Sequence, residues 1–141
     1  MNYTEKEIAF AKQIQSSFNY KAPEIENAEK IKPLVESKDD GGGSTDVADV
    51  SWTVPTVGLN AATWVPGTPA HSWQATACGG TDIGIKGMMV AAKTLALTGI
   101  DLFTDNSIIQ KATEEFNKAK GPDFQYKALL GDRKPALNYR D

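Results

Sequence analysis

The sequence predicts an α/β fold in which a few strands pack with helices, as in the closing segment of a larger α/β domain. Apolar residues recur at helical spacing near both ends of the chain, and residues 56–65 and 72–77 are predicted as short strands. Two or three strands are too few for an independent sheet with both faces covered. At 141 residues the chain is long enough for one domain and too short for two. We therefore interpret residues 1–141 as a single portion of such a domain.

The N-terminal part is predicted to be helical. Thr4-Glu5-Lys6-Glu7 has the form of a capping box, in which side chains satisfy the free N–H groups at a helix start. The helix is expected to extend to about Asn19. Its apolar residues at helical spacing are Ile8, Ala11, Ile14 and Phe18. Pro23 opens a second, more polar stretch that Pro33 interrupts, and this stretch is either helical or a loosely packed turn.

The middle of the chain contains a glycine-rich segment and the predicted strands. Residues 38–44, Lys-Asp-Asp-Gly-Gly-Gly-Ser, are either a flexible linker or a tight, ordered loop. Val57, Leu59 and Ala61 alternate with polar or small residues, which is typical of a strand. The Pro66–Pro69 turn follows.

Two helices are predicted after these strands. The first begins at Thr81-Asp82 and has the strongest apolar periodicity in the chain. Residues 83–100 are apolar but interrupted by two lysines and three glycines, which favours a buried helix over a membrane span. Asp105 is expected to cap the second helix and Gly121-Pro122 to end it, with residues 122–141 extended across the surface.

Composition excludes several classes of function. The net charge of −3 and the scattered distribution of the 15 cations argue against a nucleic-acid partner. The only cysteine, Cys78, cannot form an internal disulfide and is expected to be a buried, unreactive thiol in a cytoplasmic protein. No signal peptide is expected, because the N-terminus lacks a basic region followed by an apolar run. Neither a nucleotide-binding glycine loop nor a Gly-x-Ser-x-Gly nucleophile motif is present.

His71, the only histidine, is the leading candidate for chemistry. It lies in a turn-rich loop between a predicted strand and a long helix, where loops often present functional groups. Three interpretations of His71 are open: it has no role, it is a metal ligand, or it is a general acid or base. Asp46 and Asp49 follow the glycine-rich segment, and helix capping is the favoured interpretation for both. The tryptophans near these loops are attributed to packing.

Several sequence blocks together resemble one enzyme family. They are Gly42-Gly43-Ser44-Thr45-Asp46-Val47-Ala48-Asp49-Val50-Ser51-Trp52, Pro66-Gly67-Thr68-Pro69-Ala70-His71-Ser72-Trp73-Gln74, Ile83-Gly84-Ile85-Lys86-Gly87-Met88 and Ala91-Ala92-Lys93. Residues 3–12 and 132–137 are similar as well, so the resemblance covers essentially the whole chain. The blocks resemble the C-terminal part of the M20 metallopeptidase/amidohydrolase family, in particular its aminobenzoyl-glutamate hydrolase branch.

The resemblance implies hydrolysis of an amide bond in a small, dipeptide-like or N-acyl amino acid substrate at a dinuclear zinc or manganese site. It implies that His71 is the last metal ligand of that site, and that Ser44, Thr45 and Asp46 border the substrate pocket. The family's other ligands, its glutamate base and its lid domain have no counterpart in this sequence.

The expected function takes account of the missing metal ligands and glutamate base. We expect that the chain binds no metal and has no activity by itself, and that it contains no catalytic residue of its own. Its expected partner is the N-terminal half of such an enzyme or a second copy of itself, with no membrane involved. The alternative is a non-catalytic binding or regulatory module.

Overall fold

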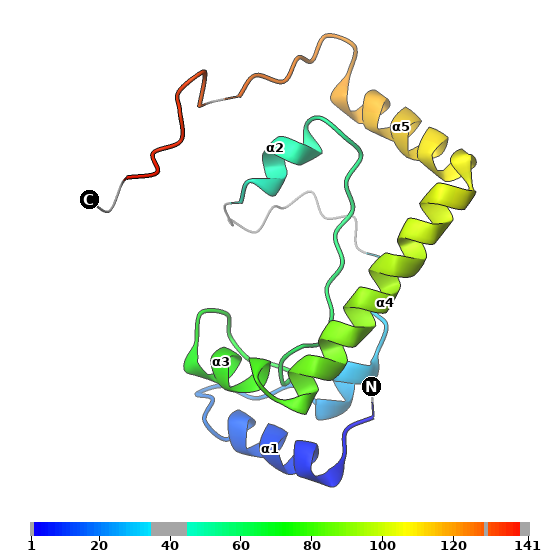
Figure 1. Cartoon of the computed structure of the whole chain (residues 1–141). Helices are drawn as coiled ribbons and strands as arrows, with labels where there is room; N and C mark the ends of the chain where they lie inside the picture. Colours follow the sequence, from blue (N-terminus) through cyan, green and yellow to red (C-terminus); the bar gives the residue numbers. More distant parts are fainter. Residues whose placement is uncertain (1, 35–44, 129, 139–141) are drawn as a thin grey trace. The chain divides into compact units, whose positions relative to one another are not determined.

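A computed structural model describes residues 2–34, 45–128 and 130–138, and these residues are helical or irregular (Figure 1). The elements in chain order are α1 (Glu5–Gln15), the 3₁₀-helix η1 (Ile25–Glu29), α2 (Val47–Ser51), α3 (Trp73–Gly79), α4 (Asp82–Thr104) and α5 (Asn106–Lys120). The glycine-rich segment 38–44 lies outside the described residues.

The chain forms two compact units, each built from two stretches of sequence. Unit 1 comprises Met1–Lys38 and Gly58–Phe103, and unit 2 comprises Asp39–Val57 and Thr104–Asp141. Unit 1 therefore contains α1, η1, α3 and all of α4 except its last residue, Thr104. Unit 2 contains α2 and α5.

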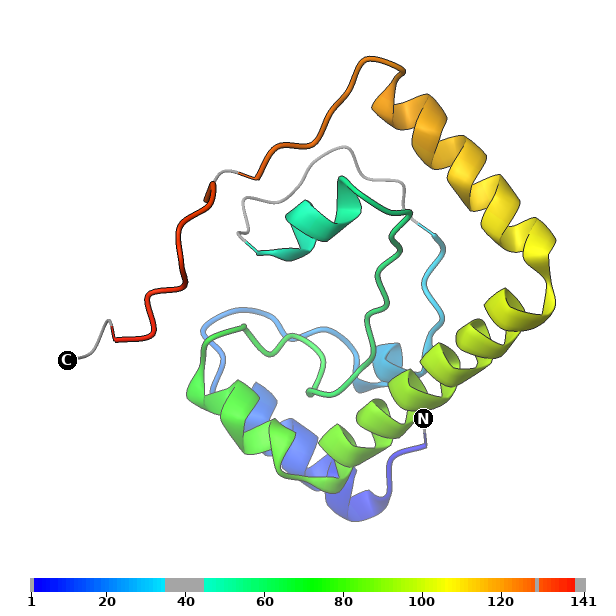
Figure 2. The ribbon, with the colours of Figure 1, turned by 45° about the horizontal axis from the view of Figure 1, so that its top comes forward.

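Unit 1 has a small apolar core at the place where its helices meet. Ala11 and Ile14 of α1 pack there with Val65, with Cys78 of α3 and with Ile83 of α4. Figure 2 shows α1 alongside α3 and the start of α4. The expectation that Cys78 is a buried, free thiol is confirmed.

The first predicted helix is confirmed, although it is shorter than expected. Thr4 caps α1 through the complete capping box with Glu7. The helix ends at Gln15, because the following amides turn back on it: Ser17 N–H donates to the carbonyl of Ile14 at 3.0 Å. The more polar stretch after Pro23 forms the single 3₁₀ segment η1.

The predicted α/β fold is wrong, because the described residues contain no strand. Residues 56–63 form neither helix nor strand, and no neighbouring segment pairs with them among the described parts of the chain. Alternation of side chains describes the two faces of a strand and does not provide the backbone partner that a sheet requires. This segment instead passes close to α4. A Cβ added at Gly87 of α4 would lie 2.8 Å from the Cα of Thr63.

The predicted strand at residues 72–77 is also wrong, since this segment forms α3. Ser72 caps the helix by accepting a hydrogen bond from the N–H of Ala75 at 3.1 Å. The buried residues of α3 are Gln74, Ala75 and Cys78. The i, i+4 spacing of Gln74 and Cys78 places both on one face of a helix.

The long helix α4 is confirmed in position, but the expectation that it is buried is wrong. Only Ile83, Gly84 and Gly87 are buried, and Phe103 near its end is 94% exposed. By length and composition α4 is able to cross a membrane, with a mean hydropathy of 1.3. Core helices of soluble proteins share these properties, and the start of α4 belongs to the core of unit 1.

Unit 2 contains no buried side chain among its described residues. As predicted, Asp105 caps α5 by accepting from the N–H of Ser107 at 2.9 Å, and Gly121 follows the helix end. Beyond α5 the described tail has no helix or strand. The tail contacts the region of α2, where the rings of Trp52 and Phe124 stack with centroids 4.8 Å apart.

Candidate functional site

His71 lies in the loop that leads into α3, with its backbone in the left-handed region at φ 57°. No other non-glycine residue in the described part of the chain has a positive φ. An L-residue adopts this conformation at a cost of about 1–2 kcal/mol. Such conformations persist where the surrounding structure imposes them, and they cluster at functional sites. The side chain of His71 is exposed and therefore accessible to a ligand.

The end of α1 holds the first part of this loop. Gln15 Nε2 donates hydrogen bonds to the carbonyl oxygens of Pro23 at 2.9 Å and Pro66 at 3.1 Å. The Tyr20 hydroxyl donates to the carbonyl of Gly67. Gly67 has φ 90°, and a Cβ there would lie 2.6 Å from Cδ of Pro23, so this position requires glycine. The loop backbone is thus fixed by contacts distant in sequence.

Ser72 holds the other end of the loop. Its hydroxyl donates to the carbonyl of Pro69 at 2.7 Å and accepts from the N–H of Ala75 at 3.1 Å. One side chain therefore closes the loop and caps α3. His71 lies immediately before this anchor, which fixes the direction in which its imidazole leaves the backbone.

A shallow, open hollow of about 470 Å³ is lined in part by His71. It is lined by Trp64, His71, Ser72, Trp73, Ala75 and Thr76. Trp64 is 37% exposed and Trp73 is 62% exposed. The expectation that the tryptophans serve packing is therefore wrong for Trp73. Ser72 is the sequence signal for this outcome, because a helix cap there makes Trp73 the first residue of α3, just before the buried residues Gln74 and Ala75.

The donors near His71 do not form a complete metal site. No group of three or more His, Cys, Asp or Glu side chains in the described residues is arranged to hold a metal ion. A structural or catalytic zinc ion takes three or four protein ligands. His71 fits as a single ligand, and the described residues do not fit a bound metal by themselves.

The predicted substrate contacts belong to unit 2, whereas His71 belongs to unit 1. Thr45 and Asp46 are exposed and precede α2, and Ser44 lies outside the described residues. Thr45 Oγ1 accepts from the N–H of Val47 at 3.4 Å. Asp46 occupies the N-cap position, but its side chain makes no capping hydrogen bond.

Asp49, the other acid interpreted as a cap, has a different role. It lies within α2, where its Oδ1 accepts from the Tyr126 hydroxyl at 2.5 Å. This hydrogen bond raises the pKa of Tyr126.

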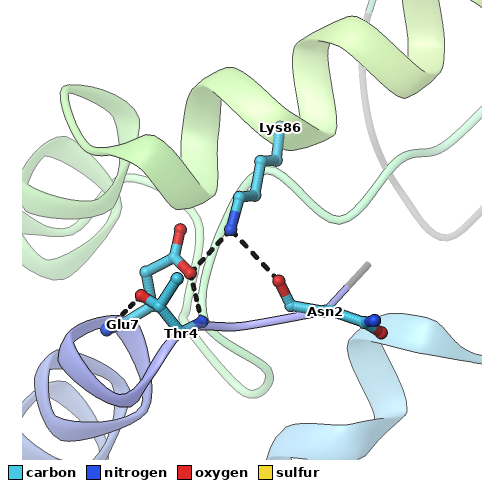
Figure 3. Close-up of polar contacts among 4 residues, drawn as sticks. All are labelled: Asn2, Thr4, Glu7 and Lys86. Atoms are coloured by element: carbon cyan, nitrogen blue, oxygen red, sulfur yellow. Dashed lines mark hydrogen bonds and ion pairs between the residues drawn. The ribbon is translucent and has the colours of Figure 1, made fainter.

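A polar cluster between α1 and α4 was not anticipated (Figure 3). Glu7 Oε2 accepts from the N–H of Thr4 at 2.5 Å and from Lys86 Nζ at 2.7 Å. Lys86 also donates to the carbonyl of Asn2 at 3.1 Å. The hydrogen bond from Lys86, together with that from Thr4, lowers the pKa of the buried Glu7 carboxyl. The capping box identified Glu7, but its pairing with a residue 79 positions away depends on the tertiary fold.

Two buried oxygens beside this cluster, the Tyr3 hydroxyl and Glu7 Oε1, have no hydrogen-bond partner among the described residues. Burial, with a further contribution from nearby Cys78, raises the pKa of Tyr3. The cluster therefore holds a charged pair at the junction of α1 and α4.

Comparison with known proteins shows that the chain is similar to a hydrolase subunit. It is 34% identical over 136 residues to a subunit of p-aminobenzoyl-glutamate hydrolase from Escherichia coli (strain K12). The alignment covers 80% of this chain and 28% of the relative, so the chain spans less than a third of that protein's length. No protein-family profile matches the chain, and no solved structure matches it.

Proposed function

We propose that this chain is the C-terminal part of an M20-type, metal-dependent hydrolase that cleaves the amide bond of aminobenzoyl-glutamate or another N-acyl amino acid. The observation that carries the proposal is the 34% identity to the p-aminobenzoyl-glutamate hydrolase subunit. Since the match covers 28% of that relative, we propose that the rest of the catalytic site comes from regions corresponding to the remainder of that protein.

In this proposal His71 supplies one ligand to a zinc or manganese ion, and regions corresponding to the rest of the relative supply the other ligands. The anchored loop supports this role, because contacts that orient a ligand raise its affinity for the metal. The exposed imidazole is accessible to an approaching chain. With one ligand, unit 1 alone is expected to bind metal weakly. Ser44, Thr45 and Asp46 are proposed to contact the substrate.

The exposed apolar surface of α4 supports the need for further protein regions to cover it. Its exposed apolar residues are Ile85, Met88, Met89, Val90, Leu95, Leu97, Ile100, Leu102 and Phe103. A helix that is apolar on all sides is normally buried in a larger protein or in a membrane. We propose that regions corresponding to the rest of the relative cover this surface.

Reconstitution tests the proposal. The 141-residue chain is mixed with the part of the E. coli relative that has no counterpart here, in the presence of manganese or zinc. Release of p-aminobenzoate from p-aminobenzoyl-glutamate is then measured. We expect turnover from the mixture and none from either component, with co-elution of the two chains. Robust turnover by this chain alone would overturn the proposal, and elution of this chain as a symmetric oligomer would assign the α4 surface to a second copy.

The His71→Asn variant tests the metal ligand. Asparagine adopts the left-handed region more readily than most residues, so the loop backbone is retained while the imidazole is lost. We expect turnover to fall about 100-fold or more, in line with the losses seen when metal sites are disturbed. The matched control is Lys127→Ala, an exposed residue of unit 2, which should leave turnover unchanged. Full activity of the mixture that contains the His71→Asn variant would show that His71 is not a metal ligand.

A non-catalytic binding or regulatory module is the second candidate. It is favoured by the lack of a three-ligand metal cluster among the described residues. In that case the mixture gives no turnover with any N-acyl amino acid, and His71→Asn leaves the association of the two polypeptides unchanged.

A further inference from the structure

The hollow beside His71 has two aromatic walls that the proposed metal-ligand role does not use. Trp64 and Trp73 line it together with His71, and both indoles are substantially exposed. An indole has a large apolar surface that normally finds cover in the folded protein. Two such side chains on one hollow form a surface suited to stacking against a flat ring.

The backbone positions of both tryptophans are fixed by the core. Val65, next to Trp64, is 1% exposed and belongs to the core cluster. Gln74 and Ala75, which follow Trp73 in α3, are buried. The indoles therefore extend from fixed backbone positions, so binding a ligand orders the side chains and not the backbone in this part of the site. The volume of about 470 Å³ is within the range of small-molecule sites.

We infer that this hollow binds the aromatic acyl group of the substrate, a para-substituted benzoyl ring, between Trp64 and Trp73 with its carbonyl end toward His71. The inference rests on the proposed function, because it names the part of the substrate held beside the proposed metal ligand. It assigns Trp64 and Trp73 as positioning residues for the ring.

The chemistry of the lining favours the ring over the glutamyl group. None of the six lining residues is Lys or Arg. A dicarboxylate such as a glutamyl group is normally recognised by charge-assisted hydrogen bonds from these residues. Aromatic and small polar side chains instead match a benzoyl group, which has two apolar faces and one polar end.

Nuclear magnetic resonance of the full 141-residue chain tests the inference without metal or partner. The probe is p-aminobenzoate, and N-acetylglutamate is the non-aromatic control ligand. The indole N–H signals of the three tryptophans are followed during titration to about 10 mM, a range that covers weak fragment affinities. Trp52 is the internal control, because it is 48% exposed but lies in unit 2, where it stacks on Phe124.

We expect p-aminobenzoate to shift the signals of Trp64 and Trp73 and to leave Trp52 unchanged, and N-acetylglutamate to shift none. Trp73→Ala should weaken p-aminobenzoate binding about two- to tenfold, the range typical of one aromatic pair. Trp73→Phe should retain part of the affinity, and Trp52→Ala should retain all of it. Absence of shifts, equal shifts of all three indoles, or equal shifts with both ligands would overturn the inference.

The result is distinguishable from failure of the proposed function. Selective shifts without turnover in the reconstituted mixture would leave the ring site standing and refute the hydrolase. Turnover without shifts at Trp64 and Trp73 would support the hydrolase and refute the ring site. If the added part of the E. coli relative alone protects both indoles from solvent and p-aminobenzoate does not shift them in the free chain, the hollow is a protein interface and the inference is wrong.

Discussion

Replacing Gly87 with alanine should destabilise unit 1, although alanine is the better helix former. A Cβ at this position would lie 2.7 Å from the carbonyl carbon of Ala62 and 2.8 Å from the Cα of Thr63. Both are backbone atoms, so relief requires α4 and residues 62–63 to separate. Overpacking of this kind costs about 1–3 kcal/mol. The helix propensity of alanine offsets about 1 kcal/mol, which leaves a net loss of up to about 2 kcal/mol.

Gly99→Ala is the matched control, because it lies in the same helix and no atom lies within 4 Å of the added Cβ. It should leave the free energy of unfolding unchanged or raise it by up to about 1 kcal/mol. Only Gly87→Ala introduces a clash with backbone, so a lower stability of that variant reports the contact at Gly87. Urea unfolding followed by far-ultraviolet circular dichroism measures both. Equal stability of the two variants would show that α4 does not pack on residues 62–63.

Three further predictions concern the frame of the site. Because hydrogen bonds from Lys86 and Thr4 lower the pKa of Glu7 in the folded state, the unfolded state binds more protons at acidic pH. Stability should therefore fall as pH drops below about 4.3, the ordinary glutamate pKa, and through the lower pKa of the folded state, and Glu7→Gln should flatten this profile in urea titrations at different pH. Ser72→Ala should lower the free energy of unfolding by about 0.5–2 kcal/mol through loss of the α3 cap, whereas Ser16→Ala should change it by less than about 0.5 kcal/mol, and equal effects would exclude a capping role. His71→Gly should be more stable than His71→Ala by about 1 kcal/mol in thermal unfolding, because only glycine adopts a positive φ without strain, and the opposite order would contradict the backbone conformation.

The helices near both ends were predictable because their signals are local. Thr4 and Glu7 form a capping box within four residues, and Asp105 caps α5 through the amide of Ser107. The alternation at residues 56–63 is equally local, but a strand requires a partner segment elsewhere in the chain. The sequence pattern cannot supply that partner, and the described fold holds this segment against α4 instead.

The candidate site was predictable only in part. His71 was identified because it is the only imidazole in the chain and belongs to a recognisable block. Its left-handed backbone has no local sequence signal, and the support of its loop comes from a hydrogen bond across 51 residues, between Gln15 and Pro66. The exposure of Trp73 was not predicted, because residues 72–77 were expected to form a strand. Seven residues are too few for apolar periodicity to identify α3 as a helix.

The uneven burial of α4 gives one continuous helix two local stabilities. Its first turns are held by the core through Ile83, Gly84 and Gly87, and opening them requires unit 1 to unfold. From Met88 onward the helix contributes no buried residue, so its amides should exchange with solvent deuterium by fraying from the far end. Protection of the amides in the second half of α4 from hydrogen exchange therefore reports whether this surface is covered. It should rise residue by residue when a covering chain is bound and disappear when that chain dissociates.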